Sequence, residues 1–145
     1  MKTAIIYYSK HHGNTKKLLD AIAKNNDVTL IDVTQKPTIN LLEYDRIGFA
    51  SGIYYSKFHK LLLEYAKNYM PKGKQTFFIY TYGAKKNGYT KAITDIVKQH
   101  QAEILGEFGC YGLNTFGPFK LIGGLAKGHP DKTDFKNVLS FYRGL

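Results

Sequence analysis

The sequence predicts an α/β protein in which a five-stranded parallel sheet lies between two layers of helices, a three-layer α-β-α sandwich. Short apolar runs alternate with segments whose apolar residues recur at helical spacing. That alternation is typical of β-α-β units, which set strands parallel and cover both faces of the sheet. The chain has 145 residues and no linker, repeat or low-complexity tract, so residues 1–145 are expected to form a single domain.

Each predicted strand is an apolar run bounded by polar or turn-forming residues. The five strands are expected at residues 3–8, 28–33, 44–50, 74–80 and 103–111. Four apolar stripes predict the helices: Leu18, Leu19, Ile22 and Ala23; Phe58, Leu61, Leu62, Tyr65 and Tyr69; Ala92, Ile93, Ile96 and Val97; Phe135, Val138, Leu139 and Tyr142. Asp131 or Thr133 is available to cap the fourth helix.

The composition argues against several classes of protein. No apolar run is long enough to cross a bilayer, and the first residues lack the apolar stretch of a secretory signal. The single cysteine, Cys110, excludes an internal disulfide and disfavours a cysteine-based metal site. These features predict a cytoplasmic protein. Cys110 is expected to be a small buried hydrophobe in the fifth strand, with a reactive thiol as the alternative.

The charge balance is strongly basic. There are 21 Lys and Arg against 11 Asp and Glu, which gives a net charge of +10. All of the basic residues except Arg46 and Arg143 are lysines, scattered along the chain, whereas base readout and bidentate phosphate clamps favour arginine. We therefore expect a lysine-rich solvated surface that speeds encounter with anionic partners, without a specific nucleic-acid site.

The turn after the first strand has the chemistry of a phosphate site. In open parallel sheets a ligand lies beyond the carboxyl ends of the strands, where the strand order reverses. Backbone N–H groups at the start of the next helix favour an anion there, and a glycine allows close approach. The turn residues are Ser9, Lys10, His11, His12, Gly13, Asn14 and Thr15. The same residue types also suit an ordinary capped turn.

This segment resembles the FMN-phosphate loop of the flavodoxin family. Tyr8-Ser9 followed by Gly13-Asn14-Thr15 is similar to the family's Ser/Thr-rich turn that ends in Gly-x-Thr, and the strand number and chain length agree with a short-chain flavodoxin. The resemblance implies the sheet order 2-1-3-4-5 and non-covalently bound FMN. The loop here is one residue longer than usual, and His11-His12 replaces a Ser/Thr. The two histidines either shape the turn as neutral groups or supply an imidazolium beside the phosphate at low pH.

The resemblance also implies two loops that touch the flavin ring. After the third strand these residues are Ser51, Gly52, Ile53, Tyr54 and Tyr55, with Gly52 offering a peptide near the flavin N5 atom and either tyrosine a stacking face. After the fourth strand, Thr81, Tyr82 and Gly83 would contact the pyrimidine edge through backbone groups. Alternatively, the two tyrosines pack against the next helix. Lys85, Lys86 and Asn87 are expected to be solvated.

A long glycine-rich segment follows the fifth strand. Residues 112–130 are apolar and too long for a routine connection, which is typical of a functional loop. Such a loop would cover the flavin edge or dock a partner. A purely structural loop is the alternative.

The function that the resemblance implies is electron transfer through FMN, with no catalytic or metal-ligating residue, because the cofactor carries the redox chemistry. Partners are expected to be redox proteins with acidic docking surfaces. Nearby positive charge predicts a less negative second reduction potential than in acidic flavodoxins. Two alternatives stay open: a small FMN-dependent NAD(P)H or quinone oxidoreductase, and a basic flavin-free binding module. Neither G-x-x-x-x-G-K-[ST] nor G-x-G-x-x-G occurs in the chain.

Overall fold

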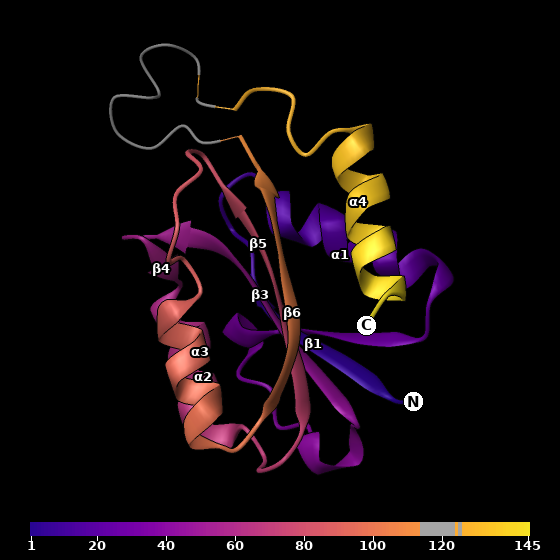
Figure 1. The fold of residues 1–145 in the computed structure, drawn as a ribbon, viewed down its shortest axis with the longest axis vertical. Coiled ribbons are helices and arrows are strands. Elements are labelled where there is room, and N and C mark those ends of the chain that lie inside the picture. Colours follow the sequence, from indigo (N-terminus) through magenta and orange to yellow (C-terminus); the bar gives the residue numbers. More distant parts are fainter. Residues whose placement is uncertain (114–123, 125) are drawn as a thin grey trace.

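The described part of the chain, residues 1–113, 124 and 126–145 of the computed structural model, folds around a parallel sheet (Figure 1). Its strands are β1 (Thr3–Tyr8), β2 (Val28–Asp32), β3 (Arg46–Tyr54), β4 (Lys57–Phe58), β5 (Gln75–Tyr82) and β6 (Glu103–Tyr111). The order across the sheet is β2-β1-β3-β5-β6, and β4 pairs antiparallel with the end of β3. Counted without β4, this order is 2-1-3-4-5, so the predicted topology is confirmed.

Among the described residues, two helices cover each face of the sheet (Figure 1). They are α1 (Asn14–Asn25), α2 (Lys60–Tyr69), α3 (Lys91–Gln99) and α4 (Lys132–Arg143). α1 packs beside α4, and α2 packs beside α3. Two short 3-10 turns, Val33–Gln35 and Leu41–Glu43, lie between β2 and β3. This arrangement is the predicted three-layer sandwich.

The core is divided between the two faces of the sheet because successive residues of a strand point to opposite sides. In β1, Ile5 packs with the residues of α1 and α4, whereas Ala4 and Ile6 pack with those of α2 and α3. In β5, Phe77 packs on the side of α1 and α4, and Phe78 packs on the side of α2 and α3. Strands buried on both faces read as continuous apolar runs, which is why those runs predicted them.

The third strand is longer than predicted and ends in a hairpin. It continues through Tyr54 and pairs with β4 across a turn made of Tyr55 and Ser56. These two residues have φ angles of 52° and 66°. A left-handed pair of this kind is typical of a type I′ hairpin turn, which usually contains Asn and Gly. The residues predicted to form a loop after the third strand, Ser51 to Tyr55, therefore belong to β3 and its hairpin turn. The sequence does not indicate this, because the turn lacks the usual residues.

Phe58 belongs to β4 and not to the second helix, where the apolar stripe placed it. Its ring is buried and meets the ring of Phe78 edge to face, with centroids 6.2 Å apart. The residue is thus a core residue, as its pattern indicates, but it reaches the core from a strand. His59 then caps α2, because its Nδ1 atom accepts a hydrogen bond of 3.1 Å from the N–H of Leu61.

The C-terminal half contains a predicted cap and a predicted buried cysteine. Asp131 caps α4 by accepting a hydrogen bond from the N–H of Asp134, and the Asp134 carboxylate accepts one from the N–H of Asp131. Cys110 is 6% exposed in β6, and burial raises the pKa of its thiol to about 12. The thiol is thus protonated near neutral pH, which favours the buried hydrophobe over the reactive thiol.

None of the described helices has the length and apolar character to span a membrane.

Candidate functional site

The described chain has a cleft at the carboxyl ends of its central strands, where the strand order reverses between β1 and β3. Ten of the residues predicted from the sequence line it: Ser9, His11, Asn14, Thr15, Gly52, Ile53, Tyr54, Thr81, Tyr82 and Gly83. Gly112 and Leu113, which follow β6, complete the wall. Loops far apart in the sequence therefore meet at one site.

The turn between β1 and α1 is folded back onto the start of the helix. The Oγ atom of Ser9 accepts a hydrogen bond of 2.9 Å from the N–H of Lys16. His12 and Gly13 both have left-handed backbones, with φ angles of 58° and 64°. A left-handed residue next to a right-handed one, as Gly13 is next to Asn14 at the start of α1, turns successive N–H groups toward a common point and creates an anion-binding concavity. Gly13 is the N-cap of α1 and has no side chain to satisfy the first N–H groups of the helix.

Asn14 is the most informative polar side chain of the cleft. It is only 6% exposed, and its Nδ2 atom donates a hydrogen bond of 2.8 Å to the carbonyl of Leu113. Its Oδ1 atom is buried and has no donor among the described residues. A buried acceptor left unsatisfied costs about 1–3 kcal/mol, so a ligand O–H or N–H group placed here would be stabilised. Chemically, this atom fits a hydroxyl-bearing chain such as the ribityl group of FMN.

Two further contacts connect the segments that line the cleft. The Oγ1 atoms of Thr15 and Thr81 lie 3.0 Å apart in a buried hydrogen bond that joins α1 to β5. A Cβ atom at Gly112 would lie 2.8 Å from the Nδ2 atom of Asn14, so this close approach requires glycine. The sequence identified residue 112 only as the start of a long loop. Residues 114–123 and 125 of that loop lie outside the described residues.

The two candidate stacking residues are placed differently. Tyr54 is half-buried and lines the cleft, whereas Tyr55 is 98% exposed at the hairpin turn. The Tyr54 ring meets Tyr8 edge to face at 5.5 Å and His59 at 5.0 Å. Tyr8 and His59 stack in parallel, with centroids 3.7 Å apart. His59 is not among the residues predicted for the site, because no pattern in the sequence indicates that its ring lies beside this cleft.

The remaining predicted residues lie at or behind the rim. Lys10 is exposed, and its Nζ atom lies 3.5 Å from a carboxylate oxygen of Asp32. His12 is exposed and its ring contacts that of His11 at 4.2 Å. Ser51 is fully buried, and its Oγ atom accepts a hydrogen bond of 3.1 Å from the N–H of His59. Ser51 thus holds the hairpin to the start of α2 and does not line the cleft.

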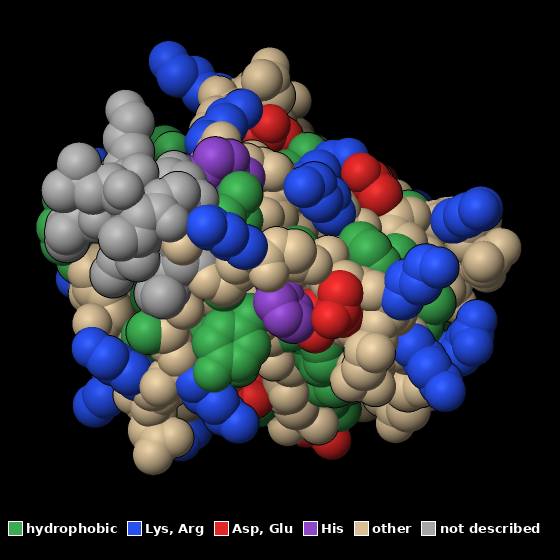
Figure 2. Space-filling model, turned by 90° about the horizontal axis from the view of Figure 1, so that it is seen from above, with side chains coloured by type: hydrophobic (Ala, Val, Ile, Leu, Met, Phe, Trp, Pro, Cys, Tyr) green, Lys and Arg blue, Asp and Glu red, His purple; other side chains and the backbone are tan. Residues whose placement is uncertain are grey.

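The electrostatic environment of the cleft is positive. Neither residues 51–57 nor residues 81–88 contain an acidic side chain, and Lys57, Lys85 and Lys86 are exposed there. Figure 2 shows Lys and Arg side chains on several sides of this end of the molecule, with fewer acidic ones. An anionic ligand or partner therefore meets a favourable potential.

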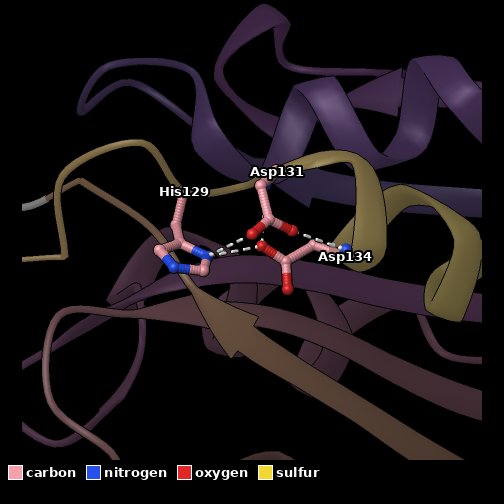
Figure 3. A network of polar contacts seen from close by, with 3 residues as sticks. All are labelled: His129, Asp131 and Asp134. Carbon is pink, nitrogen blue, oxygen red and sulfur yellow. Dashed lines mark hydrogen bonds and ion pairs between the residues drawn. The ribbon is translucent and has the colours of Figure 1, made fainter.

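Three polar side chains gather at the start of α4 (Figure 3). The Nδ1 atom of His129 lies 2.7 Å from the Oδ2 atom of Asp134 and 3.7 Å from a carboxylate oxygen of Asp131. The same carboxylates accept the hydrogen bonds that cap the helix. Since these oxygens are already used by protein donors, the group is accounted for as a helix cap.

Comparison with known proteins identifies the family of this chain. The flavodoxin domain model matches residues 5–112. An uncharacterized protein of Methanocaldococcus jannaschii is 40% identical over 149 aligned positions, which cover all of this chain and 98% of that protein. The chain therefore belongs to the flavodoxin family.

Solved structures support the same fold at low sequence identity. Oxidised flavodoxin 2 of Bacillus cereus has a TM-score of 0.70 at 18% identity, with 97% of this chain and 94% of that chain covered. The FMN-bound flavodoxin of Fusobacterium nucleatum has a TM-score of 0.67 at 14% identity, with 99% and 96% covered. At these identities the likeness extends to the fold alone.

Proposed function

We propose that this protein binds FMN non-covalently in the cleft and transfers electrons through it. The observation that carries the proposal is the buried Oδ1 atom of Asn14 at the N-terminus of α1, which has no hydrogen-bond donor among the described residues and lies beside a turn with two consecutive left-handed residues. Together they offer an anion site and, next to it, an acceptor for a hydroxyl group. That is the pairing a phosphate on a ribityl chain requires.

The phosphate would be held by the turn between β1 and α1. Its N–H groups and the helix dipole of α1 favour the dianion. Thr15 adds a hydroxyl that is already oriented by Thr81. The Oγ atom of Ser9 holds the turn against the helix. Few rotamers need to be ordered on binding, which favours affinity.

The ring would lie between the two loops at the ends of β3 and β5. Tyr54 lines that space with an aromatic side chain, and Thr81, Tyr82 and Gly83 line it as well. Bound FMN supplies electron transfer in one-electron or two-electron steps. The protein residues orient it, exclude water from one of its faces and set the local electrostatic potential.

The proposed partners are redox proteins with acidic docking surfaces. Lys10, Lys57, Lys85 and Lys86 are exposed and belong to segments whose other residues line the cleft, and the whole chain carries a net charge of +10. Complementary charge raises association rates strongly at low ionic strength. A partner of this kind would be captured less well as salt is added.

The test is a titration of the purified protein with FMN, followed by absorbance and by flavin fluorescence. We expect saturable binding of one FMN per chain with a Kd in the micromolar range or below, and weaker binding of riboflavin, which lacks the phosphate. Absence of FMN uptake refutes the proposal and favours the flavin-free binding module. Steady-state consumption of NAD(P)H by the FMN-loaded protein would instead support a small oxidoreductase.

A further inference from the structure

His59 contacts a residue of the cleft wall without lining the cleft itself. Its ring stacks in parallel on the ring of Tyr8, with centroids 3.7 Å apart and an angle of 6° between the planes. The ring of Tyr54, which lines the cleft, meets His59 at 5.0 Å and Tyr8 at 5.5 Å, on edge in both cases. The stacked pair therefore supports the aromatic side chain that the cleft presents to a ligand.

The position of the His59 ring is fixed by hydrogen bonds on both sides. The His59 N–H donates to the Oγ atom of Ser51 over 3.1 Å. The Ser51 hydroxyl donates in turn to the carbonyl of Gly52, another residue of the cleft wall, over 2.5 Å. On the helix side, the Nδ1 atom of the ring accepts from the N–H of Leu61 over 3.1 Å. Contacts with β1, β3 and α2 thus hold the imidazole in one place.

This arrangement requires a neutral imidazole. Protonation places a hydrogen on Nδ1, where it faces the N–H of Leu61, so the charged ring must turn away from the helix. The titratable or charged side chains that act on the ring from the elements around it are Tyr8 of β1, Tyr54 of β3, and Lys60 and Glu64 of α2. Burial, and then Lys60, lower the pKa of His59, while Glu64 raises it by less.

We infer that His59 is a positioning residue that orients Tyr54 toward a flavin ring while the imidazole is neutral and releases it when the imidazole is protonated. The part of this inference that concerns the flavin rests on the proposed function. The part that concerns Tyr54 rests on the ring contacts alone. Flavin affinity should therefore fall as the pH falls through the pKa of His59.

The first test uses ligand-free protein and two variants that separate the ring from the helix cap. His59→Phe keeps a ring beside Tyr8 and Tyr54 but neither caps α2 nor titrates, whereas His59→Asn keeps the cap and removes the ring. In 1H–15N spectra of wild type, the amide resonances of Gly52 and Tyr54 should shift with a midpoint below pH 6.5. Neither variant should show this titration. If a variant retains it, another group is responsible and the inference is overturned.

The second test measures the affinity for riboflavin and for FMN at about pH 7.5 and about pH 5, on either side of the ordinary histidine pKa. Riboflavin lacks the titratable phosphate and therefore reports on the ring side of the cleft. At the higher pH, His59→Phe should bind nearly as wild type does, and His59→Asn roughly twofold to tenfold more weakly, the range of one aromatic pair. At the lower pH, wild type should approach His59→Asn, while His59→Phe keeps its affinity for riboflavin. His100→Phe, at the end of α3, is the control for the loss of a histidine.

The two tests distinguish failure of this inference from failure of the proposed function. If wild type takes up no flavin, the proposed function fails, and the amide titration decides whether His59 orients Tyr54. If flavin binds and His59→Asn is as tight as wild type, the ring contributes nothing and the inference is overturned. It is overturned as well if His59→Phe binds no more tightly than His59→Asn at the higher pH.

Discussion

At the N-terminus of α1, the Asn14 side chain makes one hydrogen bond with the described part of the chain, and its acceptor atom has no partner there. Its amide nitrogen holds the carbonyl of Leu113, so the segment after β6 is tied to the first turn. Its amide oxygen is buried without a donor among the described residues. An asparagine can donate a hydrogen bond from its nitrogen and accept one at its oxygen without adding charge. An aspartate adds a negative charge, and a leucine forms no hydrogen bond.

Replacement of Asn14 by aspartate should weaken FMN binding by at least about tenfold. The new carboxylate lies next to the phosphate site, and like charges at close range are unfavourable by more than 1 kcal/mol even with partial screening. The matched control is Asn26→Asp, because Asn26 donates a similar hydrogen bond of 2.9 Å to Ile22 at the other end of α1. Flavin fluorescence titrations of both variants measure the difference. Equal FMN affinities would place the phosphate elsewhere.

His59 should make the free energy of unfolding depend on pH. Burial, and then the nearby Lys60, hold the pKa of His59 below its ordinary value of 6.5. Its Nδ1 atom accepts the capping hydrogen bond of α2, which requires an unprotonated nitrogen. The unfolded chain therefore takes up the proton first, and stability present above about pH 6.5 is lost as the pH falls through the lowered pKa.

Urea unfolding of wild type and His59→Asn between pH 7.5 and about pH 4.5 tests this. Asparagine is also a good N-cap and does not titrate, so the variant should lose less stability over the range. His100→Asn, at the end of α3, controls for the loss of a histidine as such. If His59→Asn and His100→Asn show the same pH dependence, the His59 imidazole is not the group responsible.

At the scale of the element, the β3–β4 hairpin sets the geometry of the site. Its antiparallel pairing carries Tyr54 over the cleft, while the turn leaves Tyr55 exposed. Both turn residues hold a left-handed backbone without being glycine or asparagine. Such conformations cost roughly 1–2 kcal/mol for each ordinary residue. The surrounding pairs and the buried Phe58 must therefore offset that strain.

The double replacement Tyr55→Asn with Ser56→Gly should stabilise the protein by about 1–2 kcal/mol, because Asn-Gly is the preferred pair in a type I′ turn. Thermal unfolding measures the gain, and Lys85→Asn with Lys86→Gly, in an exposed loop, is the control for composition. FMN affinity should change little, since Tyr55 does not line the cleft. A large loss of FMN affinity would make Tyr55 the stacking residue instead of Tyr54.

At the scale of the whole molecule, the dominant property is the excess of positive charge. The hairpin residues 51–57 and residues 81–88 at the end of β5 contribute lysines and no acidic residue to the end of the sheet where the cleft lies. Figure 2 shows basic side chains on several sides of this end of the molecule. In such a field an anionic form of the bound cofactor is stabilised relative to its neutral form.

Given FMN binding, the potential for the second one-electron reduction should be less negative than in an acidic flavodoxin. Spectroelectrochemical titration measures it. Replacement of both Lys57 and Lys85 by glutamate should shift it to a more negative value, whereas Lys24→Glu, at the far end of α1, should shift it less. A potential that is the same in all three proteins would show that local contacts, and not the charge field, set it.

Much of the architecture follows from local sequence. Apolar runs predicted the parallel strands because strands buried on both faces need continuous apolar side chains, and the stripes predicted the helices. The Ser9 to Thr15 turn could be recognised because its donors and its glycine are contiguous in the chain. The hairpin was missed because Tyr55-Ser56 adopts a turn conformation that its residue types do not favour.

By itself, the sequence determined the order of the elements, the apolar faces they bury and the basic surface, since these depend on residue type and spacing. Tertiary structure decided which distant groups meet: Asn14 with Leu113, Thr15 with Thr81, and Tyr54 with Tyr8 and His59. Those contacts depend on strand register and on the bend of a hairpin. Both are set by packing across the whole sheet, which no short stretch of sequence encodes.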